Sequence, residues 1–408
     1  MKAAGIVAEF NPLHNGHVYM MKEARRISGA DAVAVAMSGN FVQRGQAALI
    51  NKWSRTKNAL LNGADLVLEI PTLFCLQNAG GYASAGVRIL EALGCDCTIC
   101  CGAASTESET IREIADIIRN NREYLQNKIS EAARTGLSYP AAREKAVLSL
   151  AGPETDREVL VSTIRDPNNI LAIEYMLASD KSDVVCIPRI GAAYNDDFSS
   201  DNEYQSAGGI RKLLKDKAPE EAAEIIRSYV PQETYEDIRS GRLVFREDVS
   251  EYLKLSIINK DASEIDECPS GGEGLGNLLK EASVLKESMD DIISYAKSKR
   301  YTYTRLSRLC MQVLLGIDRR NYSFEMPEYI RVLGFNEKGR EVLSEIKRRK
   351  SNAIPIITNI NKECPKPGSD AEKMLMLDVK ASDVYNLLAG KDTNINSDYR
   401  KTPVMINL

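Results

Sequence analysis

The chain has 408 residues, of which 44% are hydrophobic and 27% are charged, and this composition is ordinary for a soluble globular protein. It excludes a mostly disordered chain, a collagen-like repeat and a small disulfide scaffold. The formal net charge of −4 excludes a uniformly basic nucleic-acid coat but not a local basic patch. At one domain per roughly 100–200 residues, the length predicts two or three domains.

The sequence predicts a cytoplasmic protein that does not enter a membrane. It contains no run of about 18 apolar residues, and its N-terminus (MKAAGIV) lacks the apolar region and cleavage site of a signal peptide. The nine cysteines are an odd number without disulfide-like spacing, which favours a reducing compartment.

Both histidines of the chain lie in the single segment His14-Asn15-Gly16-His17. Residues 3–10 (AAGIVAEF) predict a buried strand that Asn11-Pro12 ends, and residues from 18 onward predict an amphipathic helix. Ligands of open α/β sheets bind at the carboxyl ends of strands, and helix N-termini favour phosphate. Gly16 lacks a Cβ, so a nucleotide can approach the backbone there. We expect the imidazoles to stabilise charge at an α-phosphate. The alternative is a chance pair of surface histidines, or a helix N-cap with an imidazole nearby.

The alternation of strands and helices continues beyond this turn and predicts a parallel sheet. The expected elements are strands at 31–37, 65–70, 95–101 and 183–187, and helices at 55–62, 83–93 and 106–119, with another beginning at 209–214. From about residue 216 helical segments dominate. We therefore predict an α/β protein with a Rossmann-like N-terminal domain at 1–215 and a mainly α-helical C-terminal domain at 216–408.

Four cysteines (Cys95, Cys97, Cys100 and Cys101) are close enough in sequence to suggest a zinc or iron–sulfur site. The same segment also fits a buried strand in which cysteine packs as a small hydrophobe. Adjacent strand residues point to opposite faces, so Cys100 and Cys101 would not easily share one metal. We favour the strand and predict no protein-held metal.

The His-x-Gly-His spacing resembles the HxGH motif of nucleotidyltransferase-fold proteins, and longer motifs resemble one branch of them, the tRNA(Met) cytidine acetate ligases. The segments that carry this resemblance are VAEFNPLHNGH (7–17), MSGNFVQRG (37–45), KWSR (52–55), GADLVLEIP (63–71), PNNIL (167–171) and KRYTYTR (299–305). The resemblance extends from residue 1 to about residue 385.

The resemblance implies a Rossmann-like nucleotidyltransferase domain and a ligase that makes acetyl-adenylate from acetate and ATP, the ATP carrying Mg²⁺, with no permanently bound cofactor. The acetyl group then goes to N4 of the wobble cytidine (C34) of elongator tRNA(Met). It further implies catalytic roles for His14 and His17. The implied ATP contacts are Val7, Ala8, Glu9, Phe10, Asn11, Pro12, Gly16, His17, Met20, Gly102, Asn169 and Arg189.

A basic stretch in the second half favours RNA binding, although a solvated helix face is the alternative. Residues 296–350 hold 14 Lys and Arg and 6 Asp and Glu, a net of +8, with Tyr301, Tyr303 and Tyr322 interleaved. Aromatic side chains can stack on unpaired bases. The predicted RNA-binding residues are Lys299, Arg300, Arg305, Arg308, Lys347, Arg348 and Arg349.

Two departures from the family pattern keep other functions open. Ala103-Ala104 stands where Ser-Glu is usual after the glycine, and Ser206-Ala207-Gly208-Gly209-Ile210-Arg211 has glycines where hydroxyls are common. A catalytically impaired RNA-binding homologue is therefore one alternative. A small-metabolite adenylyltransferase is another, and a tRNA synthetase is disfavoured because no KMSKS-like motif is present.

Overall fold

The computed structural model describes residues 1–103, 108–152, 155–189, 198, 204–350, 352–390 and 395–407. Its centre is an eight-stranded sheet in the order β10-β8-β5-β2-β1-β6-β7, with β9 beside β8. The strands are β1 (Lys2–Ala8), β2 (Ala32–Ser38), β5 (Leu66–Ile70), β6 (Asp96–Ala103), β7 (Val184–Pro188), β8 (Ile330–Phe335), β9 (Ile356–Ile357) and β10 (Val404–Met405). A separate two-stranded hairpin joins β3 (Phe41–Val42) to β4 (Gln46–Ala47).

The five strands from β5 to β7 are parallel, so their carboxyl ends meet at one edge of the sheet. The chain first adds strands on one side of β1 and then crosses to add β6 and β7 on the other. The point between β1 and β6 is therefore the topological switch point, where open α/β sheets bind their ligands.

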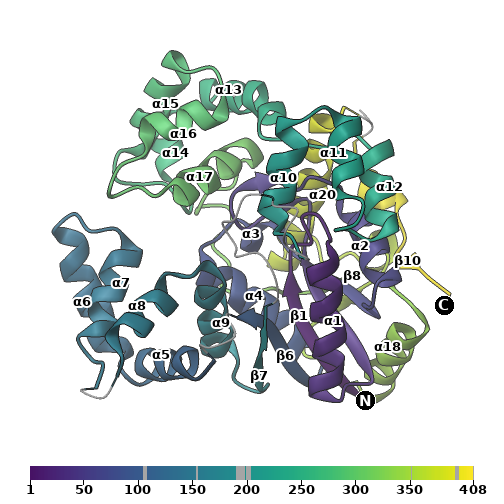
Figure 1. Ribbon diagram of the computed structural model, residues 1–408. Coiled ribbons are helices and arrows are strands. Elements are labelled where there is room, and N and C mark those ends of the chain that lie inside the picture. The colour runs from purple at the N-terminus through teal and green to yellow at the C-terminus, as the bar shows by residue number, and fades with distance from the viewer. Residues whose placement is uncertain are drawn as a thin grey trace.

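Helices cover both faces of the sheet and form two lobes on its left in Figure 1. Helices α1 (Asn15–Ser28) and α2 (Lys52–Leu61) pack on one face, and α4 (Ala79–Glu91), α9 (Pro167–Ala178) and α18 (Glu337–Arg349) pack on the other. The lower lobe holds α5 (Ser108–Asn120), α6 (Arg122–Arg134), α7 (Tyr139–Leu148) and α8 (Arg157–Arg165). The upper lobe holds α13 (Ser250–Ile258), α14 (Ala262–Asp266), α15 (Leu275–Leu285), α16 (Met289–Ala296) and α17 (Tyr303–Leu315).

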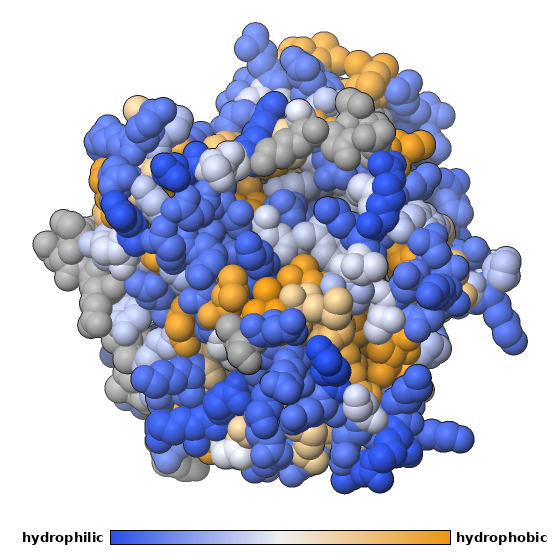
Figure 2. All heavy atoms as spheres, turned by 90° about the vertical axis from the view of Figure 1, so that its right-hand side faces the viewer, coloured by the Kyte–Doolittle hydropathy of each residue, from blue (hydrophilic) through white to orange (hydrophobic). Residues whose placement is uncertain are grey.

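The remaining elements connect these layers. They are α3 (Thr72–Cys75), α10 (Ala207–Asp216), α11 (Pro219–Ile226), α12 (Gln232–Ser240), α19 (Ile360–Glu363), α20 (Asp370–Leu388) and the 3₁₀ turns η1 (Glu247–Val249) and η2 (Ser397–Arg400). No helix in the described ranges is long and apolar enough to span a bilayer. The face that carries α12 and α18, on the right of Figure 1, is mainly hydrophilic, with hydrophobic atoms gathered near its centre (Figure 2).

The expected α/β fold and each predicted strand of the first half are confirmed. The first helix begins earlier than residue 18, at Asn15, because the His14 side chain caps it. Helices dominate after residue 216, as predicted, but three strands there were not predicted: β8 pairs antiparallel with β5 and extends the sheet together with β9 and β10. The division of the chain at residue 215 stays a prediction, but sheet and core continue across it.

The cysteine segment forms β6, as predicted. Cys97 and Cys101 pack into the core on one face of the sheet, and Cys100 packs into the core on the other. The alternation of side chains along a strand explains this separation. All nine cysteines are free thiols, and Cys101 lies beside Cys186 with their sulfur atoms 3.8 Å apart.

Four buried charged residues, which we call the ionic core, join the late strands to the early ones. Lys52 Nζ lies 2.7 Å from Glu69 Oε1 and 2.8 Å from Asp398 Oδ2. Arg331 Nη1 lies 3.1 Å from Glu69 Oε2 and 2.8 Å from the same Asp398 oxygen. The two positive charges of the ionic core are thus neutralised by its two carboxylates. Although burial opposes ionisation, Lys52 and then Arg331 hold the pKa of Asp398 well below its usual value.

Candidate active site

The HxGH segment forms the start of α1, directly after the carboxyl end of β1. His14 is the N-cap residue, and its Nδ1 accepts a hydrogen bond from the Gly16 N–H at 3.1 Å. His17 occupies the N3 position, and its Nδ1 accepts from the His14 N–H at 3.3 Å. This reciprocal pair is a capping box built from histidines instead of the usual serine and glutamate.

The capping box fixes the tautomer of both rings. A nitrogen that accepts a hydrogen bond carries no proton, so each neutral imidazole must carry its proton on Nε2. The two rings lie 3.7 Å apart between centroids, with an interplanar angle of 32°. The motif therefore presents two Nε2–H donors side by side at the switch point of the sheet.

Burial keeps both imidazoles neutral. Burial, and then the cationic Arg189, lower the pKa of His17 to about 3. The pKa of His14 is also far below 6.5, because of burial and then of His17, Arg189 and Arg211. Neutral imidazoles beside two guanidiniums form a region that favours an anion.

Gly16 has a different role from the one that the sequence suggested. A Cβ on Gly16 would lie 2.9 Å from His14 Cε1 and 3.0 Å from His14 Nδ1. Glycine is therefore required because the capping imidazole folds back over this position. The expected close approach of a nucleotide to the backbone stays a prediction.

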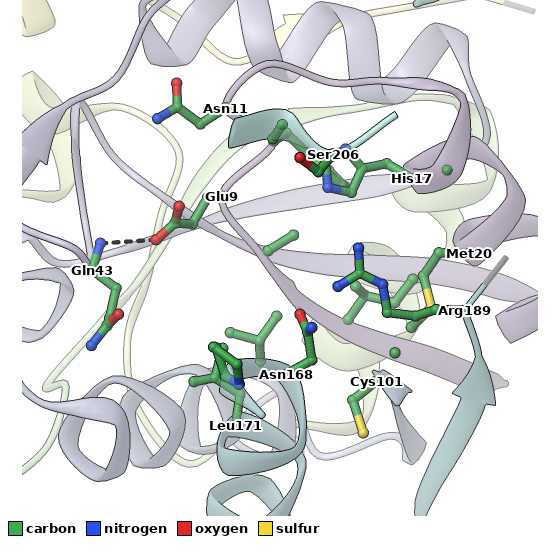
Figure 3. Close-up of a pocket in the computed structure, with 18 of the residues that line it drawn as sticks. Glu9, Asn11, His17, Met20, Gln43, Cys101, Asn168, Leu171, Arg189 and Ser206 are labelled. Atoms are coloured by element: carbon green, nitrogen blue, oxygen red, sulfur yellow. Dashed lines mark hydrogen bonds between the residues drawn. The ribbon is translucent and has the colours of Figure 1, made fainter. Parts of the chain in front are cut away.

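A cavity of about 430 Å³ opens in front of this turn. Figure 3 shows His17 and Ser206 on one side, Asn168 and Leu171 opposite, and Arg189 reaching in between them. Four arginines line the cavity (Arg44, Arg189, Arg211 and Arg308). Glu9 is the single carboxylate among the described residues that line it, and its Oε1 accepts from the Gln43 N–H at 2.9 Å. The cavity is thus strongly cationic.

Helix α10 supplies a second helix N-terminus to the cavity. Ser206 caps it by accepting from the Gly209 N–H at 2.9 Å, and Ser206 and Ala207 line the cavity. Arg211 Nη1 donates to the Asn11 carbonyl oxygen at 2.5 Å, which holds the guanidinium beside the HxGH turn. Backbone N–H groups thus remain at the helix start where glycines replace the usual hydroxyls. Ala103 is buried in β6, and Ala104 lies outside the described residues.

Most residues expected to contact ATP line this cavity. They are Val7, Ala8, Glu9, Phe10, Asn11, Gly16, His17, Met20, Gly102 and Arg189, together with His14. Pro12 and Asn169 are not among the lining residues, and Asn169 is buried in the first turn of α9. Its neighbour Asn168 faces the cavity instead (Figure 3). Asn11 Nδ2 is buried without a hydrogen-bond partner among the described residues, so it is a donor that a ligand can use.

A second cavity of about 840 Å³ lies between the two helical lobes and shares part of its wall with the first. The predicted RNA-binding residues separate around it. Arg300 and Arg305 line the second cavity and Arg308 lines both, whereas Lys299 is exposed outside them. Lys347, Arg348 and Arg349 lie exposed at the end of α18, on the other side of the molecule from α17 (Figure 1).

Sequence reasoning assigned no role to several residues that line the first cavity. Gln43, Arg44, Asn168, Arg211 and Thr304 all belong to segments that were singled out as motifs, so the signal was present. What the sequence does not contain is the packing that brings the 37–45 segment, α9 and α17 to one cavity.

This fold, with an HxGH capping box at its switch point, defines a member of the HIGH nucleotidyl transferases, and the sequence profile described as "HIGH Nucleotidyl Transferase" matches residues 1–400. The chain is 35% identical over 417 residues to the tRNA(Met) cytidine acetate ligase of Clostridium perfringens strain SM101, covering 99% of this chain and 100% of that protein. It is 36% identical to that of Clostridium kluyveri, covering 100% of both. The chain belongs to the family of tRNA(Met) cytidine acetate ligases.

Solved structures agree with this assignment. The crystal structure of Thermotoga maritima TmcAL bound with alpha-thio ATP superposes with a TM-score of 0.88, at 30% identity and with 100% of both chains covered. The apo form of the same protein superposes with a TM-score of 0.90, again at 30% identity and over the full length of both chains. The resemblance inferred from the motifs is therefore confirmed.

Proposed function

We propose that this chain activates acetate with ATP and transfers the acetyl group to N4 of the wobble cytidine of elongator tRNA(Met). Family membership supports this activity, and so does the ATP analogue bound to the related Thermotoga protein. The observation that carries the proposal is the histidine capping box, which aims two neutral Nε2–H donors into a cavity lined by Arg189 and Arg211.

In the first step an acetate oxygen attacks the α-phosphorus of ATP, the bond to the β-phosphate breaks, and pyrophosphate leaves. Negative charge on the phosphate oxygens grows as this bond breaks. Donors that are already oriented stabilise such charge without reorganisation, and this is the role of His14, His17 and the two helix N-termini. Arg189 and Arg211, which lie near the two histidines, supply positive charge to the same cavity.

In the second step the N4 amine of cytosine attacks the acetyl carbonyl, AMP leaves, and the amine loses a proton. The amine is a weak nucleophile because its lone pair is delocalised into the ring, so the activated mixed anhydride is needed. Glu9, as the single lining carboxylate, is placed to accept the proton, because only one of its oxygens accepts the Gln43 N–H.

Mg²⁺ would enter this cavity as the counter-ion of ATP. A protein-held Mg²⁺ site uses carboxylates, and Glu9 is alone among the described lining residues. Arg189 and Arg211 instead fit the phosphate oxygens of ATP directly. Mg²⁺ would therefore be carried by the phosphates of ATP, where it would neutralise their charge, and the described lining residues offer it only the carboxylate of Glu9.

The test is acetate-dependent exchange of labelled pyrophosphate into ATP, measured without RNA. We expect exchange in the wild type and a loss of about 10²–10³-fold in His14→Ala or His17→Ala, the range known for removing one transition-state donor. Arg227→Gln, an exposed change at the C-cap of α11 outside both cavities, is the control. Exchange that needs no acetate would indicate an adenylyltransferase for another substrate. No exchange even with tRNA present would favour the catalytically impaired homologue.

Glu9→Gln tests the second step. We expect the single-turnover rate of acetyl transfer to tRNA to fall about 10²-fold, and by more than the exchange rate falls, because only the transfer step needs a proton acceptor. A variant whose transfer rate and exchange rate fall by the same factor would contradict the role of Glu9.

A further inference from the structure

The second cavity is a passage between the helical lobes that ends at the reacting end of the first. Gln43, Ala79, Ile170, Thr304 and Arg308 line both cavities, whereas His14 and His17 line the first alone. The junction therefore lies beside Gln43 and Glu9, away from the histidine donors (Figure 3). A molecule in the second cavity can reach the bound acyl group without crossing the phosphate end.

The two walls of this passage differ in chemistry. Helices α5, α8 and α9 contribute an apolar wall of five isoleucines: Ile114, Ile118, Ile164, Ile170 and Ile173. The facing wall carries Arg300, Arg305, Arg308 and Arg319, from α17 and the segments beside it. Glu174 is the single carboxylate among the described lining residues, and it pairs with Arg143. An apolar wall facing a cationic wall fits a ligand with a flat base on one side and phosphates on the other.

Backbone carbonyls, more than carboxylates, hold these arginines. Arg305 donates to the Ser270 and Gly271 carbonyl oxygens at 3.0 and 3.1 Å, and Arg319 donates to those of Pro269 and Asp266 at 3.0 and 3.2 Å. Carbonyls orient a guanidinium but leave its charge in place. Among the described residues, Glu273 is the one carboxylate that reaches this wall, and Arg300 and Arg305 share it at 3.0 and 3.5 Å.

Arg308 sits at the junction itself. Its Nε is shielded from solvent and has no hydrogen-bond partner among the described residues, and no described carboxylate forms an ion pair with it. Burial, and then the cations of Arg305 and Arg44, lower the pKa of Arg308 to about 10. The β3–β4 hairpin packs so tightly here that a Cβ on Gly45 would lie 2.3 Å from the Arg308 backbone nitrogen. The protein thus holds an uncompensated cation in a rigid place.

We propose that this cavity, which we call the acceptor channel, takes the unpaired target cytidine of the RNA together with its flanking phosphodiesters. The base packs against the isoleucine wall, and the phosphodiesters bind Arg308 at the junction and Arg305 and Arg319 further out. This inference rests on the proposed function for the identity of the base. It assigns the entry of the RNA to the channel and not to the basic end of α18.

The experiment is a titration of each variant with unmodified elongator tRNA(Met) transcript, repeated at several salt concentrations. We expect Arg308→Gln to raise Kd at least about tenfold and Arg319→Gln to raise it about three- to tenfold. Each change should reduce the salt slope by about one. Arg319 is exposed at the channel mouth, so its variant is not expected to disturb folding. Its neighbour Arg320, equally cationic and exposed but outside both cavities, is the matched control, and Arg320→Gln should change Kd less than about twofold.

The double variant Arg348→Gln/Arg349→Gln tests the rival face on α18 and should change Kd less than about threefold. The inference is overturned if that variant loses more affinity than Arg308→Gln, if Arg319→Gln behaves like Arg320→Gln, or if the wild type binds no tRNA. It is also overturned if Arg308→Gln raises the KM for ATP in pyrophosphate exchange as much as it raises Kd for tRNA. Wild-type exchange without acetate, combined with arginine-dependent tRNA binding, would instead refute the proposed function and leave the channel standing.

Discussion

Two regions near the same end of the sheet bury charged side chains, and they balance those charges in opposite ways. In the ionic core, Lys52 and Arg331 face Glu69 and Asp398, and all four side chains are almost fully buried. At the junction of the cavities, Arg308 meets other arginines and has no described carboxylate within ion-pair distance. Burying a charge is costly unless a partner compensates it. We therefore infer that the paired charges of the ionic core stabilise the fold, and that the unpaired charge of Arg308 is placed to bind an anionic ligand.

The largest effect that would test this comparison is expected in the ionic core. Lys52→Met leaves Glu69 and Asp398 buried with Arg331 as their only cation, and we expect it to lower the free energy of unfolding by about 3–5 kcal/mol. Urea denaturation followed by circular dichroism measures this change. Lys338→Met, in an exposed pair with Glu341, should change it by less than about 0.5 kcal/mol. If Lys52→Met lowers the free energy of unfolding by less than about 1 kcal/mol, the ionic core does not stabilise the fold and the contrast with Arg308 fails.

An intermediate effect is expected from the histidines, which are buried as neutral groups beside cations. The folded-state pKa of His17 is about 3 and its unfolded value is near 6.5, so the unfolded chain binds the proton first. Stability from this residue is complete above about pH 6.5 and is lost progressively as the pH falls toward 3. His17→Gln should flatten the fall in unfolding free energy between pH 6.5 and 5. An unchanged slope in the variant would show that His17 is not neutral in the folded protein.

The smallest effect, and the one with the opposite sign, is expected at Arg308. Arg308→Met removes an uncompensated buried cation, so we expect the free energy of unfolding to rise by about 0.5–1 kcal/mol, as for many residues placed for function. Arg55→Met is the matched comparison. Arg55 is fully buried, whereas Arg308 is half-buried, and Arg55 donates to the carbonyl oxygens of Ile50 and Glu9 at 2.8 and 2.6 Å, so its loss should destabilise. Destabilisation of similar size in both variants would make Arg308 a structural residue.

Much of the active site could be predicted from the sequence because its signals are local. The strand, the turn and the helix around His14 lie within about 25 residues, and hydrophobic periodicity is read over such windows. The same is true of strands β2, β5, β6 and β7, whereas the short β3–β4 hairpin was not predicted. The histidine tautomers needed coordinates, because they depend on which nitrogen each backbone N–H reaches.

The remaining features depend on contacts between distant segments. The run IRVLGF at 330–335 is apolar enough for a strand, but only packing shows that it pairs antiparallel with β5. That strand then separates α17 from α18, so one basic stretch in the sequence becomes two groups on different sides of the molecule (Figure 1). Neighbouring residues on one helix also differ, because Asn168 faces the cavity and Asn169 faces the core.

Because β8 comes late in the chain, the central sheet cannot be completed until most of the protein has been synthesised. The HxGH turn emerges within the first 20 residues, but the edge of β5 has no partner until residues 330–335 have left the ribosome, and Lys52 lacks one of its carboxylates until residue 398 has left it. A chain whose synthesis ends before residue 330 contains every catalytic residue. It still exposes the unpaired edge of β5, and Lys52 lacks the carboxylate of Asp398 that pairs with it in the complete protein. We therefore expect incomplete copies to be removed as misfolded chains before they can consume ATP.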